Sequence, residues 1–205
     1  MQTEIISAEA PGALQKAVDL LREGGLVAFP TDTVYGLGVL AYDQRGIDQL
    51  YAVKQRNSLK AIPILLGDPD ELAQVAAGMG EIARRLAQRF WPGPLTLVVA
   101  CHPGLPPNLS PQPTIGVRMP NHPVALSLLR LTGPLAVTSA NQSGSESAAT
   151  AQEVFAQLGG RIPLILDGGR TPGGLSSTVV DCTGPEPVIL RPGPVSMAEL
   201  QAALS

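Results

Sequence analysis

Apolar residues recur at helical spacing in several segments of this chain, and short apolar runs separate those segments. The spacing predicts helices near residues 14–21, 43–53, 81–90, 124–131, 151–158 and 196–203. The apolar runs predict strands at residues 26–29, 61–66, 95–100, 115–118, 135–138, 164–167, 178–181 and 188–191. Pro63 inside the second of these strands indicates a sheet edge or a bulge, because proline has no N–H to donate to a neighbouring strand.

The last three predicted strands follow one another without long helices between them. Because this breaks a strict alternation of strands and helices, we expect an α/β fold with a twisted mixed sheet and flanking helices rather than a Rossmann sheet. No internal repeat and no long linker interrupts the chain, so residues 1–205 are expected to form one domain. Two loops rich in small residues, 143–150 and 168–174, are the candidates for mobile segments.

Polar and cationic groups gather where the predicted elements end. The run 30–38 (PTDTVYGLG) follows a buried strand, and we interpret its hydroxyls, carboxylate and flexible glycines as a ligand-binding turn. Similar clusters occur at 54–56 (KQR), 114–118 (TIGVR), 138–141 (TSAN) and 189–193 (ILRPG). Together they predict one pocket built from many segments. Its basic residues suit carboxylate and phosphate groups.

Taken singly, these clusters also have ordinary structural explanations. Lys54 and Arg56 are typical of a solvated helix C-terminus, where the helix dipole favours positive charge. Asp32 is typical of a turn carboxylate that bonds its own backbone. Only their joint occurrence favours a pocket.

Composition narrows the function classes. Hydrophobic residues make up 44% of the chain and charged residues 15%, which favours a packed globular protein over a disordered one. The net charge of −3 argues against nucleic-acid binding by the whole surface, but not against a local basic groove. The sequence has no secretory leader and no apolar stretch of about 18 residues, so we expect a cytoplasmic protein without a membrane span.

Familiar cofactor motifs are missing. The phosphate-binding pattern GxxxxGK[ST] does not occur, and residues 36–38 do not continue into GxGxxG. The two cysteines and two histidines lack zinc-ligand spacing, so we expect no protein-bound metal centre.

The order of the motifs resembles the YrdC-like threonylcarbamoyl-AMP synthase family in its short, single-domain form. The matching segments are PTDTVYGLG (30–38), KQR (54–56), WPGPLTLV (91–98), TIGVRMPNHP (114–123), TSANQSG (138–144), SSTVVD (176–181) and LRPG (190–193). They follow the family's order across most of the chain.

The resemblance implies a large open cavity that binds ATP, L-threonine and bicarbonate. A carbamate would form on the threonine amine and attack the ATP α-phosphate, expelling pyrophosphate. The product would pass to the transferase machinery that makes threonylcarbamoyladenosine in tRNA. Mg²⁺ is implied as a cofactor held mainly by the ATP phosphates, with no protein ligands.

The resemblance also implies roles for individual residues. For catalysis these are Lys54 and Arg56, and for L-threonine they are Thr33, Arg118, Thr138 and Ser177. For the nucleotide they are Arg56, Lys60, Thr114, Ser139, Asn141, Ser147 and Arg191.

Several positions depart from the family pattern. Asn57 stands where proline usually follows KxR, Leu65 stands where some members have histidine, and residues 145–149 replace the common RPSPT, which puts the role of Ser147 in doubt. Three alternatives therefore stay open: an RNA-binding protein that uses the same concavity, a carbamoyl-transfer module like that of hydrogenase-maturation proteins, and a non-catalytic paralogue. Weak RNA binding is also compatible with the synthase.

Overall fold

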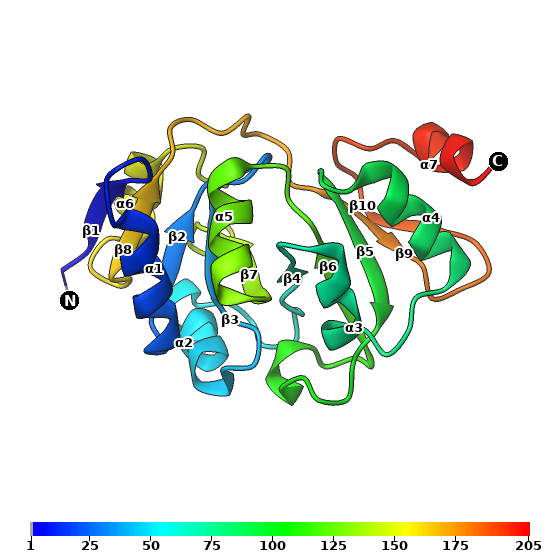
Figure 1. Cartoon of the computed structure of the whole chain (residues 1–205), viewed down its shortest axis with the longest axis horizontal. Coiled ribbons are helices and arrows are strands. Elements are labelled where there is room, and N and C mark those ends of the chain that lie inside the picture. Colours follow the sequence, from blue (N-terminus) through cyan, green and yellow to red (C-terminus); the bar gives the residue numbers. More distant parts are fainter. Residues whose placement is uncertain (1) are drawn as a thin grey trace.

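A twisted ten-stranded sheet runs through residues 2–205, which are the residues that this computed structural model describes (Figure 1). Its strand order is β1-β8-β2-β3-β7-β4-β6-β5-β9-β10. The strands are β1 (Glu4–Ser7), β2 (Val27–Phe29), β3 (Gly36–Leu40), β4 (Ile64–Leu65), β5 (Leu95–Ala100), β6 (Thr114–Arg118), β7 (Leu135–Ser139), β8 (Leu164–Asp167), β9 (Thr178–Asp181) and β10 (Val188–Arg191). The helices are α1 (Ala13–Arg22), α2 (Gln44–Lys54), α3 (Leu72–Val75), α4 (Glu81–Phe90), α5 (Pro123–Thr132), α6 (Ala151–Leu158) and α7 (Met197–Leu204).

Both strand orientations occur in the sheet. Parallel pairs join β8 to β1 and β2, β4 to β6, and β5 to β9. Antiparallel pairs join β3 to β2 and β7, β4 to β7, β5 to β6, and β9 to β10. The predicted mixed α/β sheet with flanking helices is therefore confirmed.

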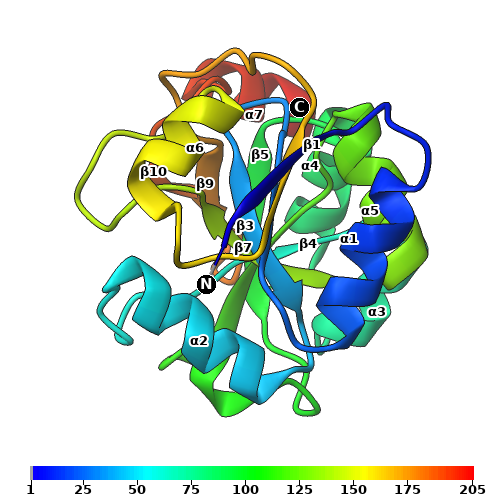
Figure 2. The same ribbon diagram turned by 90° about the vertical axis from the view of Figure 1, so that its left-hand side faces the viewer.

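The two faces of the sheet are covered by different helices. Along β2, Val27 and Phe29 pack with α1 and α5, whereas Ala28 belongs to the cluster that includes α2 and α6. This alternation is the expected consequence of the strand's two-residue period. Figure 2 shows α1 and α5 on one side of the strands and α2 and α6 on the other.

The glycines of the run 30–38 lie in a strand rather than in a flexible turn, so that part of the sequence interpretation is wrong. Gly36 and Gly38 belong to β3, on the face where Phe29 and Val137 flank them. A Cβ at Gly36 would lie 2.8 Å from Val137 Cγ1, and one at Gly38 would lie 3.0 Å from Phe29 Cε1. These glycines make room for neighbouring side chains, and only residues 30–35 form the turn.

Pro63 does not mark a sheet edge. It directly precedes β4, which is two residues long and lies between β7 and β6 in the middle of the sheet. The Pro63 carbonyl accepts a hydrogen bond from the Val137 N–H at 2.9 Å. Proline is tolerated here because it stands before the strand and offers only its carbonyl.

Three elements were not predicted from the sequence. These are the edge strand β1, the short helix α3, and a 3₁₀ turn at Pro107–Leu109 inside the proline-rich loop. β1 has mostly exposed side chains, and α3 is one turn long, so neither presents an apolar period that reveals it.

Candidate functional site

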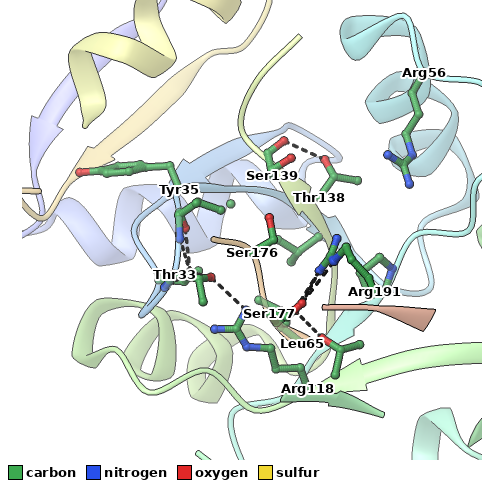
Figure 3. Close-up of a pocket in the computed structure, with 16 residues that line it drawn as sticks. Thr33, Tyr35, Arg56, Leu65, Arg118, Thr138, Ser139, Ser176, Ser177 and Arg191 are labelled. Atoms are coloured by element: carbon green, nitrogen blue, oxygen red, sulfur yellow. Dashed lines mark hydrogen bonds between the residues drawn. The ribbon is translucent and has the colours of Figure 1, made fainter. Parts of the chain in front are cut away.

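A single hollow brings together the loops and strand ends that the sequence marked as polar (Figure 3). It contains about 610 Å³ of atom-free space, part of it open to solvent. Its walls are formed by Thr31, Thr33, Val34, Tyr35, Gly36, Arg56, Pro63, Leu65, Thr96, Arg118, Val137, Thr138, Ser139, Ser176, Ser177 and Arg191.

The floor of the hollow is a stretch of sheet that continues beyond α5. Leu65 packs in the cluster of α1 and α5, and Arg118 is its register partner, so both side chains point to that face. Ser139 alternates with Leu135 and Val137 of the same cluster and shares the face. The central strands β7, β4 and β6 thus present their uncovered side to the cavity.

The turn between β2 and β3 is held by the Thr31 side chain. Its hydroxyl accepts hydrogen bonds from the N–H groups of Thr33 (3.2 Å) and Val34 (3.3 Å) and donates to the Val34 carbonyl at 2.7 Å. Thr31 and Thr33 are both buried, with their hydroxyl oxygens 3.0 Å apart. This network fixes the direction of the Thr33 hydroxyl before any ligand binds.

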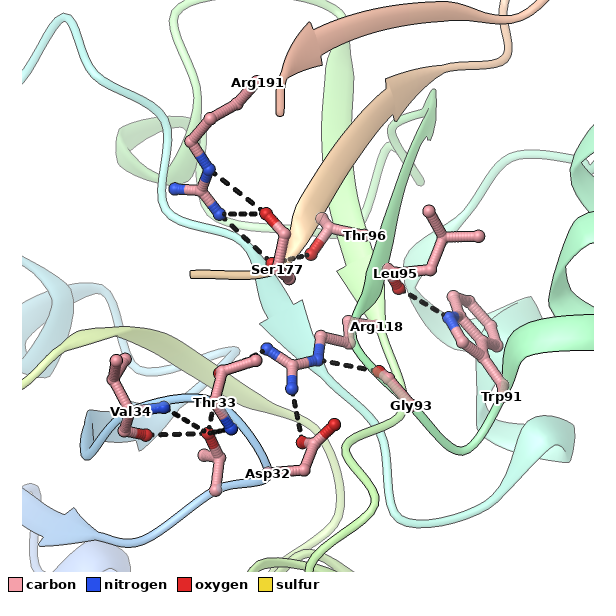
Figure 4. Close-up of polar contacts among 11 residues, drawn as sticks. Asp32, Thr33, Val34, Trp91, Gly93, Leu95, Thr96, Arg118, Ser177 and Arg191 are labelled. Carbon is pink, nitrogen blue, oxygen red and sulfur yellow. Dashed lines mark hydrogen bonds and ion pairs between the residues drawn. The ribbon is translucent and has the colours of Figure 1, made fainter. Parts of the chain in front are cut away.

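Arg118 is buried at the carboxyl end of β6 and is fixed from three sides (Figure 4). Its Nε donates to the Gly93 carbonyl at 3.0 Å, Nη1 donates to the Thr33 hydroxyl at 3.1 Å, and Nη2 forms an ion pair with Asp32 Oδ1. Asp32 Oδ2 is buried without a partner. Burial lowers the pKa of Arg118, while the Asp32 charge opposes that shift. The guanidinium is therefore a preorganised cation, because arginine remains protonated even so.

Ser177 and Arg191 form a second rigid pair on the opposite wall. Arg191 Nη2 donates to the Ser177 carbonyl at 2.8 Å and to its hydroxyl at 3.1 Å, and Nε also reaches the carbonyl. The Ser177 hydroxyl lies 2.8 Å from that of Thr96. The last strands of the sheet thus place a serine hydroxyl and a guanidinium next to each other.

Gly193 lets the chain after β10 approach this pair closely. A Cβ there would lie 2.4 Å from the Thr178 nitrogen and 2.5 Å from the Ser176 carbonyl oxygen. Because backbone cannot yield as a side chain does, we expect Gly193→Ala to destabilise the fold by about 1–3 kcal/mol and to displace Arg191. Urea unfolding measures this, with Gly184→Ala as the control because its Cβ would meet only one atom, at 3.8 Å. Equal stability of the two variants would contradict the expectation.

Arg56 reaches the cavity from the segment that follows α2. Its Nη2 donates to the Ala61 carbonyl at 3.0 Å, and Gln55 before it has a left-handed backbone (φ 51°) that ends the helix. Burial lowers the pKa of both Arg56 and Arg191, and the Arg56 charge lowers that of Arg191 further. Neither has an acidic partner among the ion pairs of the described residues. Two unneutralised guanidiniums on one cavity favour an anionic ligand.

Lys54 lies beneath the cavity rather than in its wall, and it is 1% exposed. Its ammonium donates to the carbonyls of Ser139 and Asn141, and Asn141 Oδ1 lies 3.4 Å away. The expectation of a solvated helix end is therefore wrong for this residue. Lys54 fixes the end of β7 and the turn after it, which carries the Ser139 side chain.

The burial of Lys54 makes its contribution to stability depend on pH. Burial first, and the Arg56 charge second, lower the pKa of Lys54 to about 7. The unfolded chain keeps this proton up to a pKa of about 10.4, so folding releases a proton between these values and stability rises with pH. We therefore expect the wild type to gain stability over Lys54→Met between pH 7 and pH 10. Urea unfolding at both ends checks this, and a constant difference would contradict it.

The structure brings some of the predicted site residues together and not others. The cavity wall includes Thr33, Arg56, Arg118, Thr138, Ser139, Ser177 and Arg191. Lys54, Lys60, Thr114, Asn141 and Ser147 lie outside it. Thr114 begins β6, at the opposite end from Arg118, and Lys60 is exposed. Asn141 donates to the Ser145 carbonyl at 2.7 Å and so braces the loop that contains Ser147.

Sequence reasoning missed several residues of the wall. Thr31, Tyr35, Thr96 and Ser176 line the cavity, and Asp32 pairs with Arg118. Thr96 and Ser176 stand inside the segments 91–98 and 176–181, so the motifs marked them although no role was assigned. Tyr35 hydrogen-bonds the Gly169 carbonyl at 2.7 Å, which ties the cavity to the segment 168–174. Whether that segment is mobile stays a prediction.

Metal-binding chemistry is not built into the wall. None of its sixteen residues is an aspartate, glutamate, histidine or cysteine. Residues 2–205 contain no cluster of three or more such side chains. Within the same range, no helix is long and apolar enough to cross a membrane.

Known proteins share this architecture and these motifs. The family model Sua5_yciO_yrdC, described as "Telomere recombination", matches residues 19–193. A threonylcarbamoyl-AMP synthase of Bacillus subtilis is 41% identical over 208 residues, covering 98% of this chain and 59% of that protein. A putative threonylcarbamoyl-AMP synthase of Mycobacterium tuberculosis is 41% identical over 189 residues, covering 92% of this chain and 87% of that protein.

The likeness extends to a solved structure. The crystal structure of Pyrococcus abyssi Sua5 complexed with L-threonine superimposes with a TM-score of 0.94 at 40% identity. The match covers 98% of this chain and 61% of the P. abyssi chain, so this chain spans less than two thirds of that relative and of the B. subtilis one. The family inferred from the motifs is confirmed: the chain belongs to the Sua5/YciO/YrdC family.

Proposed function

We propose that this chain forms threonylcarbamoyl-AMP and pyrophosphate from L-threonine, bicarbonate and ATP. The observation that carries the proposal is one cavity with a preorganised guanidinium on its floor and two further guanidiniums on its walls. Such a site suits a small carboxylate together with a polyphosphate. The printed names of the relatives, which are threonylcarbamoyl-AMP synthases, support the same substrates.

Arg118 is the proposed anchor of the threonine carboxylate. A guanidinium has five N–H donors, and the contacts to Gly93, Thr33 and Asp32 use three of them. One N–H remains on each Nη nitrogen, which is enough for a carboxylate. The hydroxyls of Thr33 and Ser177 flank Arg118 from two walls (Figure 4) and suit the polar groups of the amino acid.

Arg56 and Arg191 are the proposed partners of the nucleotide phosphates. Figure 3 shows both guanidiniums on the same side of the hollow, away from Arg118. Their mutual repulsion is relieved when phosphate oxygens lie between them. Ser139 and Ser176 offer hydroxyls on neighbouring segments of the wall.

The proposed chemistry needs charge stabilisation and positioning rather than a catalytic triad. The threonine nitrogen forms a bond to the bicarbonate carbon, water leaves, and a carbamate results. A carbamate oxygen then attacks the α-phosphorus as the bond to the pyrophosphate oxygen breaks. Because the carbamate is already anionic, the protein's task is to hold it in line and to stabilise charge on the phosphates.

Mg²⁺ fits this site only through the phosphates. The wall holds no carboxylate that could ligate it, and Asp32 is paired with Arg118. When bound to the nucleotide, Mg²⁺ would neutralise charge on the leaving pyrophosphate. We further propose that the protein works in the cytoplasm and passes its product to a tRNA threonylcarbamoyl transferase.

Pyrophosphate release tests the proposal. The purified chain is given ATP with threonine and bicarbonate together and with each omitted, and the quenched mixture is examined for the threonylcarbamoyl-adenylate mass. Release that needs both substrates, together with that mass, supports the synthase. ATP binding without turnover would indicate a non-catalytic paralogue. Salt-sensitive RNA binding without ATP binding would favour an RNA-binding protein.

A further inference from the structure

The cavity carries an apolar strip beside its most buried cation. Leu65 and Val137 line the hollow and are each 5% exposed, and Pro63 completes the strip on the same strand segment as Leu65. Polar groups dominate the rest of the wall. Because an apolar surface inside a polar site binds no phosphate, it needs a different explanation.

The sheet register places Leu65 directly beside Arg118. The two residues are partners across the parallel strands β4 and β6, so their side chains project from the same face about 4.8 Å apart at the backbone. On its other side Leu65 pairs with Leu135 of β7. The position of Leu65 is therefore fixed from both neighbouring strands.

Threonine's own geometry links these two features. Its carboxylate and its β-carbon are both attached to the Cα, so a methyl group on the β-carbon lies within a side chain's reach of whatever holds the carboxylate. A carboxylate on Arg118 would bring that methyl to the neighbouring apolar strip, while the hydroxyl can turn toward Thr33 or Ser177.

We propose that Leu65, backed by Val137, is a specificity-determining residue whose side chain packs against the methyl group of threonine and so selects threonine over serine. This inference rests on the proposed function. A well-packed methyl contact typically changes kcat/KM by roughly 10-fold or more. Serine would leave that space empty beside Leu65.

The test compares three amino acids in Leu65→Ala and Leu65→Val. Pyrophosphate release is measured with L-threonine, L-serine and L-3-hydroxynorvaline, which carries an ethyl group in place of the methyl. We expect Leu65→Ala to lower the threonine-to-serine ratio of kcat/KM by roughly 10-fold and to raise the hydroxynorvaline-to-threonine ratio. Leu65→Val should change both ratios in the same directions by less, and it decides the test if the alanine variant does not fold.

Leu135→Ala is the matched control. Leu135 is the register partner of Leu65, belongs to the same core cluster and is fully buried, but it does not line the cavity. It should lose stability as Leu65→Ala does and keep the wild-type ratios. Unchanged ratios in both Leu65 variants would overturn the inference, and so would an equal shift in Leu135→Ala. A wild type without threonine-dependent release would instead overturn the proposed function.

Discussion

Replacing Arg118 by alanine is expected to produce the largest loss of threonine use and a large loss of stability at once. The guanidinium is the proposed carboxylate anchor, and truncating a buried charge partner costs about 2 kcal/mol or more in binding. The KM for threonine should rise at least roughly 30-fold, while ATP binding changes little. The variant also leaves Asp32 buried without a counter-ion, which costs about 3–5 kcal/mol of folding free energy.

A double variant separates these two effects. Arg118→Leu with Asp32→Asn removes both charges of the buried pair, so it should recover much of the lost folding free energy. It should not recover threonine use, because no cation remains at the end of β6. Urea unfolding and threonine-dependent pyrophosphate release are measured on the same preparations. Recovery of activity together with stability would mean that Arg118 acts only through the fold.

The general architecture was predictable because it rests on apolar periodicity. The strands that became β2, β5 and β7 are short apolar runs between helices with one apolar face, and these were placed correctly. β3 escaped detection because its glycines resemble turn residues when seen alone. Their reason is tertiary: Phe29 and Val137 occupy the space beside them. No local pattern carries that information.

The site was predictable as a set of clusters and less so as a set of contacts. Arg118 was marked by its place at a strand end, but its pairing with Asp32 spans 86 residues and depends on the sheet order. Lys54 illustrates the opposite case. As a lysine at a helix terminus it looks solvated, yet the turn after β7 closes over it and supplies carbonyl acceptors. Burial of a charge depends on what packs over it.

Arg56→Ala is expected to impair nucleotide use without harming the fold. Arg56 has no acidic partner and repels Arg191, so its removal relieves repulsion between like charges. The two carbonyls that it contacts lie in the loop after α2 near solvent. We therefore expect unchanged or slightly higher stability, together with an increase in the KM for ATP of at least roughly 30-fold, or about 2 kcal/mol. The KM for threonine should stay near that of the wild type.

Two further variants make this prediction specific. Arg56→Lys keeps the positive charge but loses the planar fork, so it should recover part of the ATP affinity. Arg22→Ala removes an exposed arginine on α1, outside the cavity wall, and should leave both KM values unchanged. Steady-state kinetics with each substrate varied in turn measures all three. Because Arg118 and Arg56 stand on different parts of one wall, opposite KM effects from their alanine variants are the strongest expected sign of two substrates in one cavity. Equal effects on both substrates would instead mean that the cavity collapses as a unit.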